Sequence, residues 1–169
     1  MFIADTSGKE VNNRWRLPGS RYLGRRRQIQ NKSLPQSHVG HSDCIFCHPE
    51  DSTLNTIMCE NEAFYARYDN FPANPGHIEI VPKRHIESFF ELNESEILSA
   101  YELIHEAKDI LDEKYLPEAY TIGINDGKAA GRTIDHLHIH IIPRHQGDVA
   151  DPRGGIRRAA PNCDPDTWK

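Results

Sequence analysis

Three histidines stand at alternate positions in residues 135–144, which read Asp-His-Leu-His-Ile-His-Ile-Ile-Pro-Arg. Alternation is the period of a β-strand, so His136, His138 and His140 are expected to share one face while the apolar residues between them point into a core. Same-face neighbours on a strand lie roughly 6.6 Å apart, which lets three imidazoles line one groove. Near neutral pH an imidazole can act as a nucleophile or as a metal ligand. One such histidine would fit a solvated strand face, but three in register beside a glycine-bearing loop indicate a site.

A Cys-x-x-Cys motif, residues 44–47, opens the part of the chain that has a sustained apolar pattern. Two thiolates at this spacing can occupy two corners of a tetrahedral zinc site. The alternative is a redox pair, but that motif follows a βαβ context, which the upstream sequence lacks. Cys59 and Cys163 stand alone, so a zinc site here would take histidines as its other ligands and would be closed and structural.

A loop with two glycines, residues 126–133, runs into the histidine strand. Glycines let backbone N–H groups approach a phosphate closely, although a loop of this kind is usually only a hairpin connection. Because it lies just ahead of the central histidine, Asn125 and Thr133 are expected to flank the same groove. Asp69 stands where a strand meets a turn, and is expected either to accept hydrogen bonds from a substrate hydroxyl or to cap that turn.

The elements that must position these residues follow from the apolar periodicity. Besides the histidine strand, three strands are predicted at residues 63–69, 77–82 and 120–125, the first two joined by a wide turn. One long helix is predicted to follow the N-cap Asn93, with Glu96 in the capping-box position, and to end near Tyr115. Its core-facing residues are predicted to be Ile97, Ala100, Tyr101, Ile104, Ala107 and Leu111.

The chain of 169 residues, 37% of them hydrophobic, is predicted to hold one domain over residues 41–145 with a loop and tail over 146–169. Residues 1–40 carry eight Lys and Arg against two Asp and Glu and have no apolar period. They are interpreted as a poorly packed basic arm; it is either solvated, which is the favoured interpretation, or in contact with a nucleic acid or an anionic substrate.

Three composition features bound the function. The net charge of −5 argues against a general nucleic-acid binder. No run reaches membrane-spanning length, and the N-terminus lacks the basic and apolar segments of a secretory signal. Four cysteines without such a signal predict a reducing, cytoplasmic compartment.

The residues from about Cys44 to Arg144 resemble the histidine triad (HIT) family of nucleotide hydrolases and transferases, in particular its zinc-containing, diadenosine polyphosphate hydrolase-like members. The resemblance rests on the His-Leu-His-Ile-His-Ile-Ile run, the opening Cys-x-x-Cys, the turn and strand that lead to Pro82-Lys83-Arg84-His85, the helix, and the glycine loop. It implies an α+β fold, an antiparallel sheet of about five strands with one long helix packed on it. It also implies a homodimer.

The resemblance also implies roles for single residues. The middle histidine, His138, would be the nucleophile, and His140 would donate a hydrogen bond to the phosphate oxygens. A neutral imidazole can attack phosphorus without a separate base if its second nitrogen is held protonated, and a backbone carbonyl is the expected partner. Asp69 would hold the ribose hydroxyls, and Asn125 and Thr133 would line the phosphate site. The structural zinc ligands of the family correspond to Cys44, Cys47, His85 and His136.

One position departs from the family pattern. Many members carry glutamine six residues before the nucleophile, near the leaving group, where this chain has Arg132. A fixed positive charge suits an anionic polyphosphate, so the expected activity is hydrolysis of dinucleoside polyphosphates such as diadenosine tetraphosphate. The other interpretation is that Arg132 points to solvent or pairs with Asp126 or Asp135. Three alternatives remain for the function: a phosphorylase or nucleotidyltransferase, a non-catalytic nucleotide-binding module, and a zinc-linked nucleic-acid module.

Overall fold

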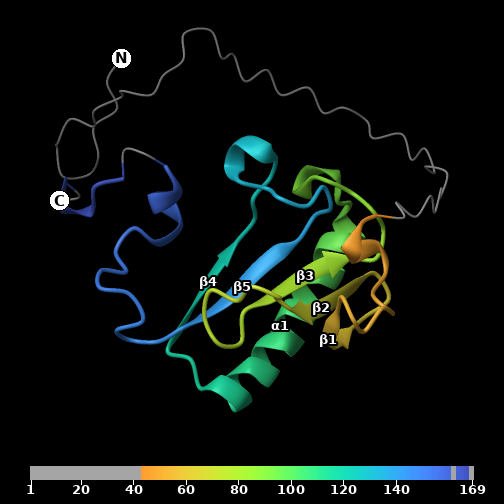
Figure 1. The fold of residues 1–169 in the computed structure, drawn as a ribbon, viewed down its shortest axis with the longest axis horizontal. Coiled ribbons are helices and arrows are strands. Elements are labelled where there is room, and N and C mark those ends of the chain that lie inside the picture. The colour runs from red at the N-terminus through yellow and green to blue at the C-terminus, as the bar shows by residue number, and fades with distance from the viewer. Residues whose placement is uncertain (1–42, 161–162, 168–169) are drawn as a thin grey trace, which may run out of the picture. The chain divides into compact units, whose positions relative to one another are not determined.

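The computed structural model describes residues 43–160 and 163–167, so the basic arm predicted at residues 1–40 lies outside the described residues. The described part builds one antiparallel sheet of five strands in the order β1-β2-β3-β5-β4, with one long α-helix packed on it (Figure 1). This architecture confirms the predicted α+β fold. The strands and the helix are β1 (Thr56–Glu60), β2 (Phe64–Tyr68), β3 (Ile78–Pro82), α1 (Glu94–Tyr115), β4 (Ala119–Gly123) and β5 (Ile139–Arg144).

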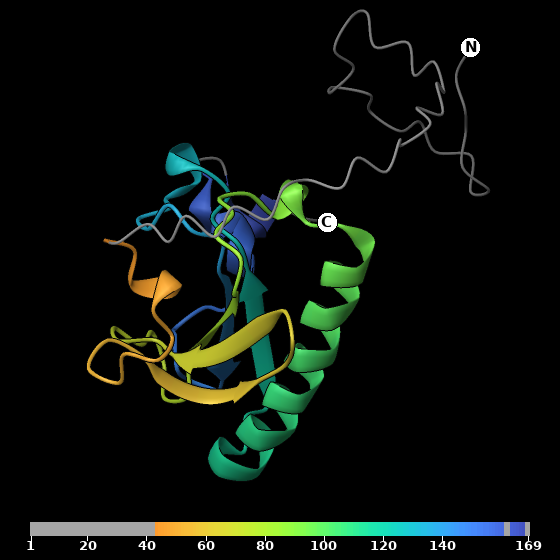
Figure 2. The ribbon, with the colours of Figure 1, turned by 90° about the vertical axis from the view of Figure 1, so that its right-hand side faces the viewer.

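The two faces of the sheet differ in chemistry. Helix α1 packs along one face, and the short helix η1 (Ile45–Cys47) lies on the opposite side (Figure 2). The core between sheet and helix is apolar, as expected for side chains removed from water. The buried members of this core are Phe64, Ala66, Ile78, Ile80, Ala100, Leu103, Ala107, Leu111, Ile139 and Ile141. Because side chains alternate along a strand, the residues between these point to the other face, which carries the polar and charged groups described below.

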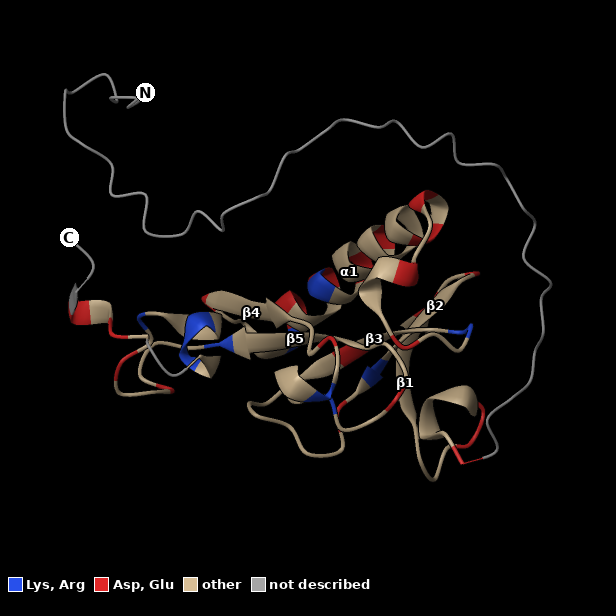
Figure 3. Cartoon of the chain, turned by 90° about the horizontal axis from the view of Figure 1, so that it is seen from above, with Lys and Arg blue, Asp and Glu red and all other residues tan. Residues whose placement is uncertain are grey.

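Helix α1 begins where the sequence predicts. The Asn93 side chain accepts a hydrogen bond from the Glu96 backbone N–H at 3.0 Å, and the Glu96 carboxylate accepts one from the Asn93 N–H at 2.9 Å. This reciprocal pair is a capping box, which satisfies backbone donors that the first turn leaves free. Acidic residues follow the exposed side of the helix (Figure 3).

The buried stripe of α1 differs in part from the predicted one. Leu103 is buried, whereas Tyr101 and Ile97 are 59% and 44% exposed, so the prediction that these two face the core was wrong. The apolar residues of this helix lie on more than one side. Periodicity alone therefore does not show which row of residues, spaced three or four apart, faces the sheet. The sheet selects the row through Ala100 and Ala107, whose small side chains permit close packing.

The alternation predicts a strand through all three histidines, but β5 begins only at Ile139. The partner strand β3 ends at Pro82, which has no N–H to donate to a ladder. The Pro82 carbonyl instead accepts a hydrogen bond from Nε2 of His136 at 2.9 Å, and the Leu137 N–H bonds to the Ile86 carbonyl. His136 and His138 therefore lie in an extended lead-in that side-chain and loop contacts hold in place.

The edge strand β1 was not predicted. It is short, largely exposed and interrupted by a register shift between Ile57 and Cys59, so its sequence lacks a clean alternation. At the other edge, helix η4 (Gly155–Ala159) contacts β4. A Cβ at Gly123 would lie 3.2 Å from Cδ1 of Ile156, so the absence of a side chain there allows the tail to lie close against the sheet. No helix in the described residues has the length and apolar character needed to cross a membrane.

Candidate active site

His138 lies directly before β5 on the sheet face opposite α1, and only 6% of it is exposed. Its Nδ1 atom lies 2.8 Å from the backbone oxygen of His136. A carbonyl can only accept a hydrogen bond, so Nδ1 carries the proton and Nε2 keeps its lone pair. Burial lowers the pKa of His138, and this favours the neutral ring. The result is an imidazole with one nitrogen suited to nucleophilic attack.

His140 is the next residue on this face, and its tautomer is set through His77. The Ala73 N–H donates to Nδ1 of His77 at 3.2 Å, so His77 carries its proton on Nε2. That atom lies 3.0 Å from Nδ1 of His140 and donates to it, which leaves a proton on Nε2 of His140. Burial, and then the neighbouring His138 and His77, lower the pKa of His140 to about 4. At neutral pH His140 is therefore a neutral hydrogen-bond donor beside His138.

Asp69 closes β2 next to these rings. Its Oδ1 accepts a hydrogen bond from the Phe71 N–H at 2.7 Å, while its Oδ2 lies 3.4 Å from Nδ1 of His77 and 3.9 Å from Nδ1 of His140. Of the two expectations for this residue, turn capping is observed directly. The second oxygen lies within the site, so the same carboxylate can also face a ligand.

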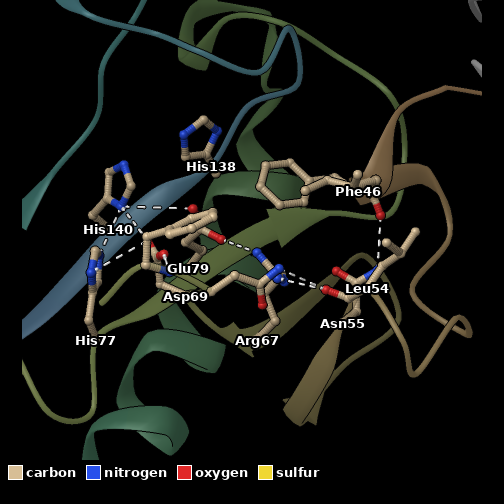
Figure 4. Close-up of polar contacts among 12 residues, drawn as sticks. Phe46, Leu54, Asn55, Arg67, Asp69, His77, Glu79, His138 and His140 are labelled. Carbon is tan, nitrogen blue, oxygen red and sulfur yellow. Dashed lines mark hydrogen bonds and ion pairs between the residues drawn. The ribbon is translucent and has the colours of Figure 1, made fainter. Parts of the chain in front are cut away.

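On the sheet face that carries the histidines, β2 and β3 contribute a buried ion pair that sequence reasoning missed. Arg67 of β2 is 2% exposed, and its Nη1 lies 2.5 Å from Oε2 of the buried Glu79 on β3 (Figure 4). Burial and then the nearby Asp69 raise the pKa of Glu79 to about 7, against the opposing effect of Arg67. The signal in the sequence was one charged residue at an inward position of each strand, 67 and 79, among apolar neighbours.

A second cluster on this side of the sheet consists of cysteine and histidine side chains. It brings together the four residues that the resemblance implied as metal ligands: Cys44, Cys47, His85 and His136. Cys44 Sγ lies 3.4 Å from His136 Nδ1, and Cys47 Sγ lies 3.2 Å from His85 Nδ1 and 3.6 Å from His136 Nδ1. Zinc bonds to sulfur and nitrogen at tetrahedral angles would place these atoms about 3.5 Å apart, so the donor set fits that metal.

The surroundings of His136 also suit a metal ligand. Its Nε2 donates to the Pro82 carbonyl, which leaves Nδ1 with a lone pair directed at the cysteines. A hydrogen bond on the far nitrogen of a ligating histidine fixes the ring orientation and raises its basicity. The ring of Phe46, which lies between the two cysteines in the sequence, packs 5.2 Å from the ring of His138, so the cluster adjoins that histidine.

The glycine loop holds Arg132, whose side chain is 9% exposed. Its guanidinium donates to the backbone and carboxylate oxygens of Glu87 at 2.7 Å each and to Asp135 at 2.9 Å. The pairing with Asp135 is the alternative interpretation drawn from the sequence. Asn125 is half-buried and Thr133 is exposed.

Comparison with known proteins agrees with this geometry. A family model described as the HIT domain matches residues 52–147. The chain is 35% identical over 106 residues to an uncharacterized HIT-like protein of Methanocaldococcus jannaschii, covering 62% of this chain and 81% of that protein. It is 32% identical over 80 residues to the asymmetrical bis(5'-nucleosyl)-tetraphosphatase of Schizosaccharomyces pombe, covering 47% of this chain and 44% of that enzyme.

Two further matches bear on activity and metal. An AP-4-A phosphorylase of Mycobacterium tuberculosis is 29% identical over 94 residues, covering 55% of this chain and 48% of that enzyme. The crystal structure of a Zn-bound histidine triad family protein from Mycobacterium smegmatis superposes with a TM-score of 0.56 at 28% identity, covering 64% of this chain and 80% of that one. The matched residues include His138 and the strand β5 that carries His140, and the chain accordingly belongs to the histidine triad (HIT) family.

Proposed function

We propose that this protein is a nucleotide hydrolase that cleaves dinucleoside polyphosphates, such as diadenosine tetraphosphate, or related nucleotide conjugates at the α-phosphate through a nucleotidyl-histidine intermediate. The observation that carries the proposal is the hydrogen bond from Nδ1 of His138 to the His136 carbonyl. It leaves Nε2 as the one nucleophilic atom of a buried, neutral ring. The tetraphosphatase relative supports the substrate class.

In the first step, the Nε2 lone pair of His138 forms a bond to the α-phosphorus. The bond from that phosphorus to the bridging oxygen breaks, and its electron pair departs with the polyphosphate leaving group. His140, which carries its proton on Nε2, donates to the phosphoryl oxygens as they gain negative charge. A well-placed donor of this kind typically contributes about 3–4 kcal/mol to transition-state stabilisation.

In the second step, water attacks the same phosphorus and the nitrogen–phosphorus bond breaks. Its electron pair returns to Nε2 of His138, and the products are a nucleoside monophosphate and a proton. Asp69 would accept hydrogen bonds from the ribose hydroxyls through its Oδ2. Asn125, Arg132 and Thr133 would contact the phosphates from the glycine loop.

The proposed metal site is a structural zinc bound by Cys44, Cys47, His85 and His136. A zinc with four protein ligands has no open position for chemistry, so its contribution is to tie the η1 region to the catalytic strand. The S–N distances and the hydrogen bond on His136 support this assignment. The zinc-bound relative supports it independently.

A second candidate function is a phosphorylase, in which phosphate replaces water in the second step. The relative that favours it is the AP-4-A phosphorylase. Both activities share the nucleotidyl-His138 intermediate and differ only in the acceptor. A non-catalytic nucleotide-binding module remains the third candidate, and a nucleophile with a free Nε2 argues against it.

The experiment that tests the function is incubation of the pure protein with a panel of adenylated substrates, with and without added phosphate. A hydrolase releases nucleoside monophosphate at a rate that does not depend on phosphate. A phosphorylase releases nucleoside diphosphate and requires phosphate. Binding without turnover of any substrate would identify the binding module.

The proposed assembly is a cytoplasmic homodimer without a membrane or nucleic-acid partner. An interface between two copies of the chain is supported by large apolar side chains on α1 and β4 that are exposed in the described part of the structure. They include Leu98, Tyr101 and Ile122. Light scattering on the purified protein would give its mass in solution. A Tyr101→Glu variant should shift a dimer toward the monomer.

A further inference from the structure

Arg67 and Glu79 form a charged pair in a position where the sheet is otherwise apolar or histidine-bearing. They are direct cross-strand partners in the pairing of β2 with β3, so both project from the face that carries His138 and His140. Their side chains are 2% and 7% exposed. Figure 4 shows Glu79 between Arg67 and the histidines, so that its carboxylate connects the two.

Folding stability alone explains this pair poorly. A buried ion pair is often no more stabilising than apolar side chains of the same volume, because both charges lose their hydration. Arg67 adds to that cost, since its Nε atom is buried and has no hydrogen-bond partner among the described residues. Its remaining contacts are the Leu54 carbonyl at 3.0 Å and the ring of Phe46 at 5.2 Å.

The second carboxylate oxygen of Glu79 faces the catalytic residues. Its Oε1 lies 4.0 Å from Nδ1 of His140. Ligand atoms of Glu79, His138 and His140 all lie within 4.8 Å of one another. The other charged groups at this place are Asp69, 3.9 Å from His140, and Arg67 on the far oxygen of Glu79. His77 is a further titratable neighbour, Tyr65 interacts electrostatically with Glu79, and Arg132 does so with His138.

We propose that Glu79, whose charged form is favoured by its contact with Arg67, is a positioning residue that supplies a counter-charge to the histidine face during nucleotidyl transfer. The inference rests on the proposed function. When Nε2 of His138 bonds to phosphorus while Nδ1 keeps its proton, the neutral ring becomes a cation. A carboxylate less than 5 Å away, shielded from water, stabilises that charge before the reaction needs it.

Arg67 has two effects in this arrangement. Burial and Asp69 raise the pKa of Glu79 to about 7 even with the guanidinium in place, and Arg67 opposes that rise, so its loss would favour the protonated, uncharged carboxyl group. The guanidinium thus increases the fraction of Glu79 that is ionised at neutral pH, and its positive charge limits the repulsion between Glu79 and the phosphates of the substrate. Arg67 therefore acts on the chemistry through Glu79.

The test is a rapid-quench measurement of nucleotidyl-protein formation from diadenosine tetraphosphate, made on the full chain. Glu79→Gln keeps the shape and the hydrogen bond from Arg67 but removes the charge. It should slow adduct formation about tenfold or more while KM changes less than about twofold. Glu79→Asp keeps the charge on a shorter side chain and should recover part of the rate. Glu60→Gln, which removes an exposed ion pair with Lys83, is the matched control and should leave the rate unchanged.

A double variant, Arg67→Met/Glu79→Leu, separates this role from a structural one. It should recover the melting temperature that Arg67→Met alone loses, because no unpaired charge stays buried, but it should keep the slow adduct formation. Recovery of the wild-type rate in the double variant, or a wild-type rate in a folded Glu79→Gln, would overturn the inference and leave the proposed function intact. A wild-type protein that forms no adduct would overturn both.

Discussion

Nε2 of His77 lies 3.0 Å from Nδ1 of His140, and this contact decides which nitrogen of His140 carries the proton. His77 is itself fixed by the N–H of Ala73. The wide turn between β2 and β3 thus sets the tautomer of a residue on β5.

The first prediction concerns that contact. His77→Phe keeps the ring volume but removes the donor, so His140 can rotate or change tautomer and lose its proton on Nε2. We expect kcat to fall about tenfold to a hundredfold, with a smaller change in KM. His77→Gln retains an N–H and should recover part of the loss. Equal kcat values for the two variants would show that the donor does not matter.

The second prediction concerns the nucleophile. His138→Ala and His138→Asn should abolish turnover while leaving the circular dichroism spectrum and nucleotide binding close to those of the wild type. Acid-free quenching of the wild type should trap a nucleotidyl-protein adduct that both variants lack. His105→Ala, on the exposed side of α1, serves as the control histidine. Near wild-type rates in the His138 variants would rule out this nucleophile.

The third prediction concerns the metal. The wild type should contain one zinc per chain by elemental analysis, and Cys44→Ser/Cys47→Ser should contain none. The melting temperature should fall in that variant more than the rate of the chemical step, because the metal holds structure. Cys59→Ser, a thiol on β1 outside the cluster, should retain the zinc. Full zinc retention in the double variant would contradict the ligand assignment.

The fourth prediction concerns Arg132. If its guanidinium contacts the leaving polyphosphate, Arg132→Gln should lower kcat/KM for diadenosine tetraphosphate by about tenfold to a hundredfold and affect an adenosine phosphoramidate much less. The ion pairs of Arg132 with Glu87 and Asp135 neutralise part of its charge, so we expect the smaller, roughly tenfold, loss of kcat/KM. Lys128→Gln, in the same loop and also near Asp135, is the control. Equal losses on both substrates would indicate a structural role.

The fifth prediction concerns stability and pH. The pKa of His140 is lowered from 6.5 to about 4, so the folded state binds fewer protons than the unfolded state over that interval, and this contribution to stability is lost as pH falls. The pKa of Glu79 is raised from 4.5 to about 7, so its contribution is present below pH 4.5 and is lost as pH rises. The two effects oppose each other.

Glu79→Gln removes one of these two effects. The free energy of unfolding of the variant, relative to the wild type, should therefore rise by about 3 kcal/mol from pH 4.5 to pH 7. Urea unfolding at several pH values measures this difference. Glu60→Gln should show a difference that stays flat with pH. A flat difference for Glu79→Gln as well would mean that Glu79 is ionised throughout this range.

The sequence predicted the parts of the fold that local patterns determine. The capping box at Asn93 and the alternation around His138 are local signals, and the structure has the helix start and the core-facing Ile139 and Ile141 that they indicate. The edge strand β1 has no clean period, and its pairing depends on β2, so local reasoning missed it.

Local sequence reasoning missed Arg67 and Glu79 for the same reason, because their contact depends on strand pairing. Arg67 and Glu79 are twelve positions apart and meet only because β2 and β3 pair in one register. A charged residue in an apolar strand signals that a partner exists but does not say which one. The tautomer of His140 likewise depends on Ala73, which has no side-chain chemistry to attract notice.

His136 makes its contact with the nucleophile through its backbone oxygen and its contact with the cysteines through its ring. Alanine scanning at this position would therefore report only on the ring, since every amino acid supplies the same carbonyl. The hydrogen bond that selects the reactive nitrogen is accepted by an atom that no codon change removes. Replacing the amide between residues 136 and 137 by an ester would weaken that acceptor without altering any side chain, but it would also remove the Leu137 N–H that bonds to the Ile86 carbonyl. The contribution of the main chain to the reactivity of His138 therefore lies beyond ordinary side-chain mutagenesis.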